Sequence, residues 1–90
     1  MIISPTRELQ LFKALGEPTK HSILHVLATS ERCACELPIL IGKTQSNTSM
    51  QLAKLKEWNL IASRRDGKKI IYRISDKRIL RIFKLLEERT

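Results

Sequence analysis

The hydrophobic pattern of this chain changes its period once, and that change constrains the fold most. Apolar residues recur every three or four positions through the first two thirds of the chain, as they do on helices. Residues 60–65 and 68–74 are instead strand-like runs separated by Asp66–Gly67. Asp-Gly between such runs predicts a tight hairpin with positive φ at both turn positions. We expect Asp76 to cap one more helix, which runs to about residue 89.

Four helices are predicted before the hairpin. Three of their expected ranges are residues 6–15, 18–29 and 45–58, and the third helix is a short one formed by Leu37, Leu40 and Ile41. Gly42 ends the third of these helices, and the Thr44 hydroxyl is placed to cap the fourth. Two helices joined by so short a connection form a helix-turn-helix, and a hairpin directly after them is a wing. The sequence therefore predicts a mainly α fold with a small β-hairpin, a single winged helix-turn-helix domain over residues 1–90.

The charge of the chain indicates a polyanionic partner. Seventeen Lys and Arg stand against nine Asp and Glu in 90 residues, which gives a formal net charge of +8. A small domain this basic is typically a nucleic-acid binder. No apolar run is long enough to cross a bilayer and no secretory signal is visible, so we expect a cytoplasmic protein without a membrane partner. No catalytic arrangement or glycine-rich phosphate loop appears, and no enzyme is predicted.

The fourth helix and the hairpin carry the candidate DNA contacts. The helix begins with short donors and acceptors, which suit base edges in the major groove, and the hairpin tip carries four cations suited to phosphates. The candidate residues are Lys43, Thr44, Gln45, Ser46, Asn47, Ser49, Gln51, Lys54, Arg64, Arg65, Lys68 and Lys69. A well-capped exposed helix and a charge-protected edge hairpin are the alternative interpretations. A nonspecific architectural DNA-binding protein or a protein-interaction module would use the same surface.

From about Leu11 to Ile74 the chain resembles the ArsR/SmtB family of winged-helix repressors. The resemblance is carried by KALGEPTKHSILHVL at 13–27, ERCACELPILIGKTQSNTSMQLAKLKEWNLI at 31–61 and RRDGKKIIYRI at 64–74. It implies a homodimer with the first and last helices at the interface. It also implies binding to an inverted-repeat operator in double-stranded DNA, and repression that an effector relieves. Met50 and Gln51 depart from the pattern, since the family often has His there.

The only reactive constellation is Cys33-Ala34-Cys35. In the family that this chain resembles, a Cys-x-Cys at the start of the third helix binds soft ions such as arsenite, antimonite, cadmium or lead, and thiolates do select soft metals. Cys33 and Cys35 are therefore the candidate metal ligands, and no other cofactor is expected. The family's third cysteine is absent, and Pro38 stands in its place. A thiol-redox input, or no metal inducer at all, is the alternative.

Helical geometry sets a condition on this cysteine pair. Side chains two positions apart on an α-helix diverge, so the pair can hold one ion only where the start of the third helix is irregular. A direct Cys33–Cys35 disulfide would be strained in a helix for the same reason. A third ligand could come from His25, Glu31, Glu36 or the other protomer. The family's second metal site, on the last helix, is not expected because residues 76–90 contain no His.

Overall fold

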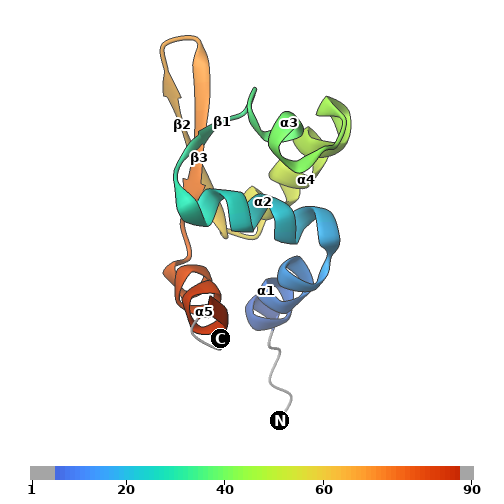
Figure 1. Ribbon diagram of the computed structural model, residues 1–90, viewed down its shortest axis with the longest axis vertical. Helices are drawn as coiled ribbons and strands as arrows, with labels where there is room; N and C mark the ends of the chain where they lie inside the picture. Colours follow the sequence, from blue (N-terminus) through green and yellow to red (C-terminus); the bar gives the residue numbers. More distant parts are fainter. Residues whose placement is uncertain (1–5, 88–90) are drawn as a thin grey trace.

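The structure is a computed structural model that describes residues 6–87. Its elements follow the predicted order, with one additional short strand (Figure 1). They are α1 (Thr6–Gly16), α2 (Pro18–Thr29), β1 (Arg32–Cys33), α3 (Leu37–Ile41), α4 (Gln45–Glu57), β2 (Ile61–Asp66), β3 (Lys69–Ile74) and α5 (Lys77–Glu87). The prediction of a mainly helical winged helix-turn-helix is confirmed. The expected continuation of α5 to about residue 89 lies outside the described residues.

Local capping chemistry explains where the helices begin and end. The Thr44 hydroxyl accepts a hydrogen bond from the Asn47 N–H at 3.1 Å, which satisfies one of the free donors at the start of α4. Gly42 ends α3 in the left-handed region with φ of 68°, and Asn59 follows α4 with φ of 60°. Asp76 accepts a hydrogen bond from the Arg78 N–H at 3.0 Å at the start of α5. The predicted roles of Thr44, Gly42 and Asp76 at these helix ends are confirmed.

The hairpin turn lies one residue later than predicted. Asp66 pairs with Lys69 in the β2–β3 ladder, so the connection consists of Gly67 and Lys68. Only Gly67 of these has positive φ, at 65°. A turn whose first central position alone is left-handed also matches the twist of paired strands. The prediction of Asp66–Gly67 as the turn was wrong because Asp66 remains in the ladder.

Strand β1 was not predicted, and it changes the setting of the cysteines. The sheet has the order β1-β3-β2, with Cys33 opposite Ile71 in an antiparallel pair. The Ala34 N–H extends this edge by donating to the Ile70 carbonyl at 2.8 Å. The expectation that the Cys-x-Cys begins a helix was therefore wrong: Cys33 ends a strand and Cys35 lies in the turn before α3. Backbone pairing with the wing holds this segment extended.

Helix α2 is the centre of the core. It crosses the middle of the molecule in Figure 1, between the wing and the two terminal helices, and its Ile23 and Leu24 are fully buried. Side chains of the other elements pack around them; the largest fully buried apolar ones are Leu37, Leu55, Ile61 and Ile79. None of the helices in the described region is long and apolar enough to span a membrane.

Candidate nucleic-acid interface

Burial of one side of α4 leaves its polar start facing outward. Thr48, Leu52 and Leu55 are buried against the core at 1%, 3% and 0% exposure, which fixes the rotation of the helix. On the opposite side Gln45, Ser46 and Ser49 are exposed. Their side chains have no hydrogen-bond partner within residues 6–87, so donors and acceptors remain available at the helix start.

The other candidates on α4 are engaged within the helix. The Thr44 oxygen is used as the cap, and the Asn47 side-chain oxygen accepts from Gln51 Nε2 at 3.3 Å. Lys54 Nζ lies 3.4 Å from Glu57 Oε1 and 5.9 Å from the Trp58 ring centroid. The structure therefore divides the predicted contacts into an open first turn and a group with intrahelical partners.

The four wing cations also differ. Arg65, Lys68 and Lys69 are exposed, and none forms an ion pair with another described residue. Arg64 instead forms a 2.8 Å ion pair with Glu31, which precedes β1. That hydrogen bond lowers the pKa of the Glu31 carboxyl below its ordinary value. Arg64 thus ties the wing to the segment that carries the cysteines, and its charge is partly neutralised.

The recognition groove is the shallow cavity between the start of α4 and the wing. Its volume is about 260 Å³. Residues of α4, of the wing and of the cysteine turn line it together, namely Gln45, Ser49, Lys68, Lys69, Ile70, Cys33, Ala34 and Cys35. That the cysteines and the candidate DNA contacts share one cavity could not be predicted from the sequence, because this placement depends on β1 pairing with β3.

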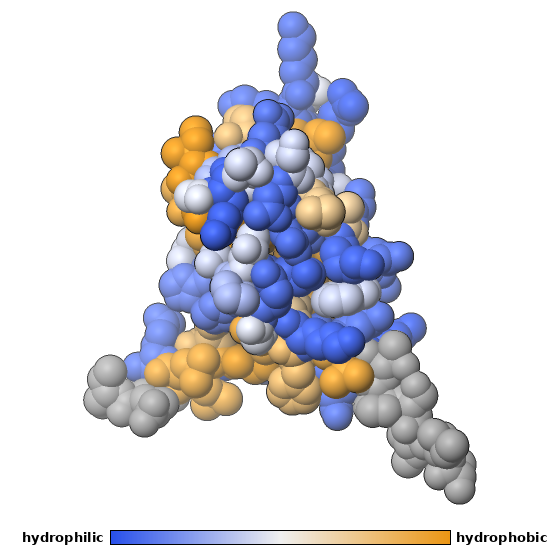
Figure 2. Space-filling view, turned by 90° about the vertical axis from the view of Figure 1, so that its right-hand side faces the viewer, coloured by the Kyte–Doolittle hydropathy of each residue, from blue (hydrophilic) through white to orange (hydrophobic). Residues whose placement is uncertain are grey.

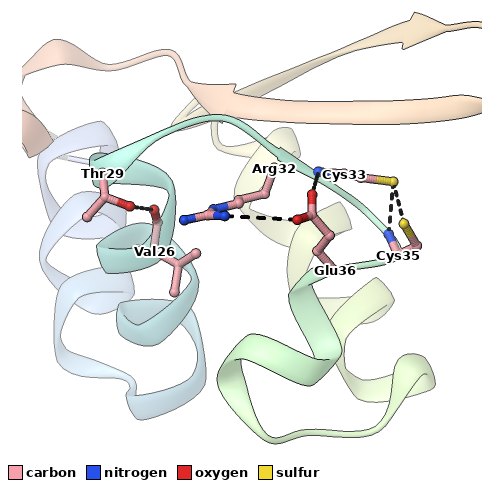
Figure 3. Close-up of polar contacts among 6 residues, drawn as sticks. All are labelled: Val26, Thr29, Arg32, Cys33, Cys35 and Glu36. Atoms are coloured by element: carbon pink, nitrogen blue, oxygen red, sulfur yellow. Dashed lines mark hydrogen bonds and ion pairs between the residues drawn. The ribbon is translucent and has the colours of Figure 1, made fainter.

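The two cysteines point toward each other in this groove (Figure 3). Their sulfurs are 2.7 Å apart, and the Cys35 N–H donates to Cys33 Sγ at 3.3 Å. Glu36 Oε1 holds the start of the turn by accepting from the Cys33 N–H at 2.8 Å. The helical divergence that argued against joint binding or a disulfide does not apply, because the segment is a strand and a turn.

Hydrogen bonding separates the acidities of the two thiols. Donation from the Cys35 thiol and then from the Cys35 N–H lowers the pKa of Cys33, and the positive charge of Lys69 adds to this effect. The pKa of Cys35 is raised, chiefly because its thiol hydrogen-bonds to Cys33. The pair therefore releases its first proton more readily than an ordinary thiol, and the remaining thiol stabilises the thiolate.

The expected third ligands lie elsewhere or are already bonded. The His25 ring packs edge-on against Phe83, with centroids 5.2 Å apart. Glu31 pairs with Arg64, and Glu36 bonds the backbone of Cys33. Over residues 6–87 no group of three His, Cys, Asp or Glu side chains is placed to hold a metal ion. Within this part of the chain the donor set is two thiols.

A polar helix start packed across a second helix, with a cationic hairpin beside it, defines the winged helix-turn-helix class of DNA-binding domain. The family model for bacterial regulatory proteins of the arsR family matches residues 17–63, more than half of the chain. The chain belongs to this family and is a DNA-binding transcriptional regulator, not an enzyme.

Similar proteins agree with this assignment. An uncharacterised HTH-type transcriptional regulator of Methanocaldococcus jannaschii is 35% identical over 80 residues, 88% of this chain and 90% of that protein. The arsenical resistance operon repressor of Escherichia coli is 37% identical over 68 residues, 74% of this chain but only 58% of the repressor. A homodimeric winged helix-turn-helix domain from Mycobacterium bovis, a possible ArsR-family regulator, superposes with a TM-score of 0.79 at 30% identity. That superposition covers 90% of this chain and 75% of the other.

Proposed function

We propose that this protein is a homodimeric repressor that binds an inverted-repeat operator and releases it when a thiophilic ligand occupies Cys33 and Cys35. The observation that carries the proposal is the recognition groove, in which Gln45 and Ser49 meet Lys68, Lys69 and the cysteine turn. A ligand on the sulfurs would lie where α4 and the wing are expected to meet DNA.

The open first turn of α4 is suited to direct base readout. The amide of Gln45 can pair in a bidentate way with adenine, and the hydroxyls of Ser46 and Ser49 can contact bases or phosphates. Arg65, Lys68 and Lys69 then hold the backbone from the wing. We assign Thr44, Asn47, Gln51 and Lys54 to supporting contacts, since each already has a partner in the helix.

The terminal helices are proposed to form the dimer interface. Leu9 and Phe12 of α1 are 51% and 60% exposed, and Leu85 and Leu86 of α5 are 65% and 56% exposed. Figure 2 shows an orange band at the end of the molecule that carries α1 and α5, and a second, separate orange patch at the upper left of the same face. Two protomers joined here would present two α4 helices to successive major grooves, which requires an inverted repeat.

Two routes connect the cysteines to the DNA contacts. A ligand on the sulfurs occupies space in the groove directly. It also reorganises a turn that is bonded to the wing, through the Ala34 N–H on the Ile70 carbonyl and through the Glu31–Arg64 pair. We expect both routes to weaken DNA binding in the presence of arsenite, antimonite, cadmium or lead.

The test is a DNA titration on an inverted-repeat fragment from the protein's own upstream region, with and without arsenite, with zinc as the control ion. We expect arsenite to release the DNA from the wild type and to have no effect on Cys33→Ser or Cys35→Ser. Release that persists in both variants would contradict the assignment of the site. Equal affinity for unrelated fragments at moderate salt would identify a nonspecific DNA-binding protein instead.

A thiol-redox input is the second candidate, and the cysteine geometry supports it. The sulfurs are 2.7 Å apart on non-helical backbone, and the pKa of Cys33 is lowered. A peroxide would take two electrons from the thiols, form the Cys33–Cys35 disulfide and leave as water. DNA release by peroxide that a dithiol reverses, with no response to arsenite, would favour this input.

A further inference from the structure

We infer that Met50 recognises thymine in the operator, by packing its side chain on the C5-methyl group of the base in the major groove. This assignment deepens the proposed function and rests on it, because it takes α4 as the helix that enters DNA. The observation that carries it is a large apolar side chain left in water in the middle of the exposed face of α4. Met50 is 65% exposed.

The burial of its neighbours turns Met50 away from the core. Thr48 and Leu52 lie two positions before and two positions after it, and they are 1% and 3% exposed. Residues two apart on an α-helix point about 200° apart, so Met50 projects from the opposite side. Ser46 and Ala53 lie on the same stripe, four positions before and three after Met50, and both are exposed. The outer stripe of α4 therefore begins with a hydroxyl and continues with apolar groups.

The chemistry of methionine limits what it can recognise on a base edge. Its sulfur is a weak acceptor and the side chain has no donor, so Met50 does not compete for the hydrogen bonds that suit Gln45 and Ser46. Among the groups that bases present in the major groove, the thymine methyl is the apolar one. Cytosine presents an amino donor instead, which Met50 would leave without a partner. A flexible, polarisable side chain also adapts well to a small apolar protrusion such as this methyl group.

The surroundings of Met50 favour DNA over a protein chain as its partner. Met50 directly follows Ser49, which lines the recognition groove together with Lys68 and Lys69. Such cations suit phosphates. The apolar side chains that we assign to the dimer interface are on α1 and α5 instead, among them Phe12 and Leu85. The exposed stripe of α4 is thus continuous with the proposed DNA surface and separate from the proposed dimer surface.

The test replaces thymine by deoxyuridine throughout the inverted-repeat fragment, which removes the C5-methyl groups and keeps the base pairs. The affinity of the full chain for both fragments is measured by fluorescence anisotropy at one salt concentration. Burial of one methyl group in each half-site should make the wild type prefer the thymine fragment by roughly tenfold. Met50→Ala is expected to bring the two affinities within about twofold of each other, because the methyl contact is lost. Met50→Leu keeps an apolar side chain and should retain the preference.

Ile39→Ala is the matched control. Ile39 is another exposed apolar side chain, at 82%, but it lies on α3, so its loss should leave the thymine preference unchanged. Specific operator binding with equal affinity for the two fragments would overturn the assignment of Met50 and leave the proposed function standing. A thymine preference that Met50→Ala does not reduce would have the same meaning. Equal affinity of the wild type for the operator and for an unrelated fragment would contradict the proposed function as well.

Discussion

The two ends of this molecule expose opposite chemistry. The wing lies at one end of the molecule, and α1 and α5 lie at the other (Figure 1). The start of α4 and the wing expose amides, hydroxyls and cations. At the other end, α1 and α5 expose large apolar side chains, with Phe12 at 60% and Leu85 at 65%. A domain of this size buries little apolar surface and is only marginally stable on its own. An exposed apolar face on such a domain is typical of a surface that binds another protein chain. We interpret the difference as two binding surfaces, one for DNA and one for a second copy of the chain.

The largest loss of operator affinity is expected from a charge introduced at the apolar end formed by α1 and α5. Leu85→Glu places a charge on the proposed interface, and a carboxylate buried there without a partner is strongly unfavourable. We expect sedimentation to report a monomer and operator affinity to fall by roughly 100-fold or more, because bivalent contact with two half-sites is lost.

Ile39→Glu is the matched control for this experiment. Ile39 lies on α3 and is 82% exposed, so the substitution makes the same chemical change away from the terminal helices. It should leave the protein dimeric. A Leu85→Glu protein that remains a dimer would show that the exposed face of α5 is not the interface.

A smaller loss of operator affinity is expected from Gln45→Ala, at the start of α4. Loss of one base contact should cost about 1–3 kcal/mol on the operator and little on unrelated DNA. The ratio of specific to nonspecific affinity, measured by competition, therefore falls. Gln10→Ala, the same change on α1, should leave this ratio unchanged. A uniform loss across all sequences would indicate that Gln45 contacts only the backbone.

The wing cations allow a finer comparison. Lys69→Ala should weaken binding to all sequences and reduce the slope of log affinity against log salt by about 1, because one phosphate contact is lost. Arg64→Ala should change that slope less, since Glu31 already partly neutralises the Arg64 guanidinium, at 2.8 Å. Equal changes in the two variants would mean that Arg64 leaves Glu31 when DNA binds.

The smallest expected change is a shift in the pKa of Cys33. Cys35→Ala removes the hydrogen bond that contributes most to lowering the pKa of Cys33. The pKa of Cys33 should therefore rise, its thiolate fraction at neutral pH should fall, and the pH profile of its alkylation by iodoacetamide should move to higher pH. Lys69→Ala should move the profile in the same direction by less. An unmoved profile in Cys35→Ala would contradict the thiol–thiol hydrogen bond.

Local chemistry made much of this fold predictable from sequence. Thr44, Gly42 and Asn59 act within a few residues of their own positions, so their effects on the helix ends can be predicted without the rest of the chain. The alternation of Ile70, Tyr72 and Ile74 likewise predicts β3 wherever its partner lies. The polar start of α4 was predictable because its buried face repeats at helical spacing.

The rest of the site depends on contacts between residues far apart in the chain, so it could not be predicted from the local sequence. Strand β1 has two residues, too few to show any period, and it exists because Cys33 pairs with Ile71 far along the chain. The position of the cysteines in the recognition groove and the Glu31–Arg64 pair follow from that contact. In α1 the three-residue spacing of Leu9, Phe12 and Leu15 is typical of a helix, yet Leu11 and Ala14 are the side chains that the core buries.

We propose that DNA binds in the same groove that holds the cysteine pair. Alkylation of Cys35 in the free protein and in the operator complex, at a salt concentration where binding is saturated, tests it most directly. Cys35 is exposed in the protomer, so it should react readily without DNA. We expect the operator to slow this alkylation at least tenfold. An alkylation rate that stays the same on a saturated operator would show that DNA does not cover the cysteine pair.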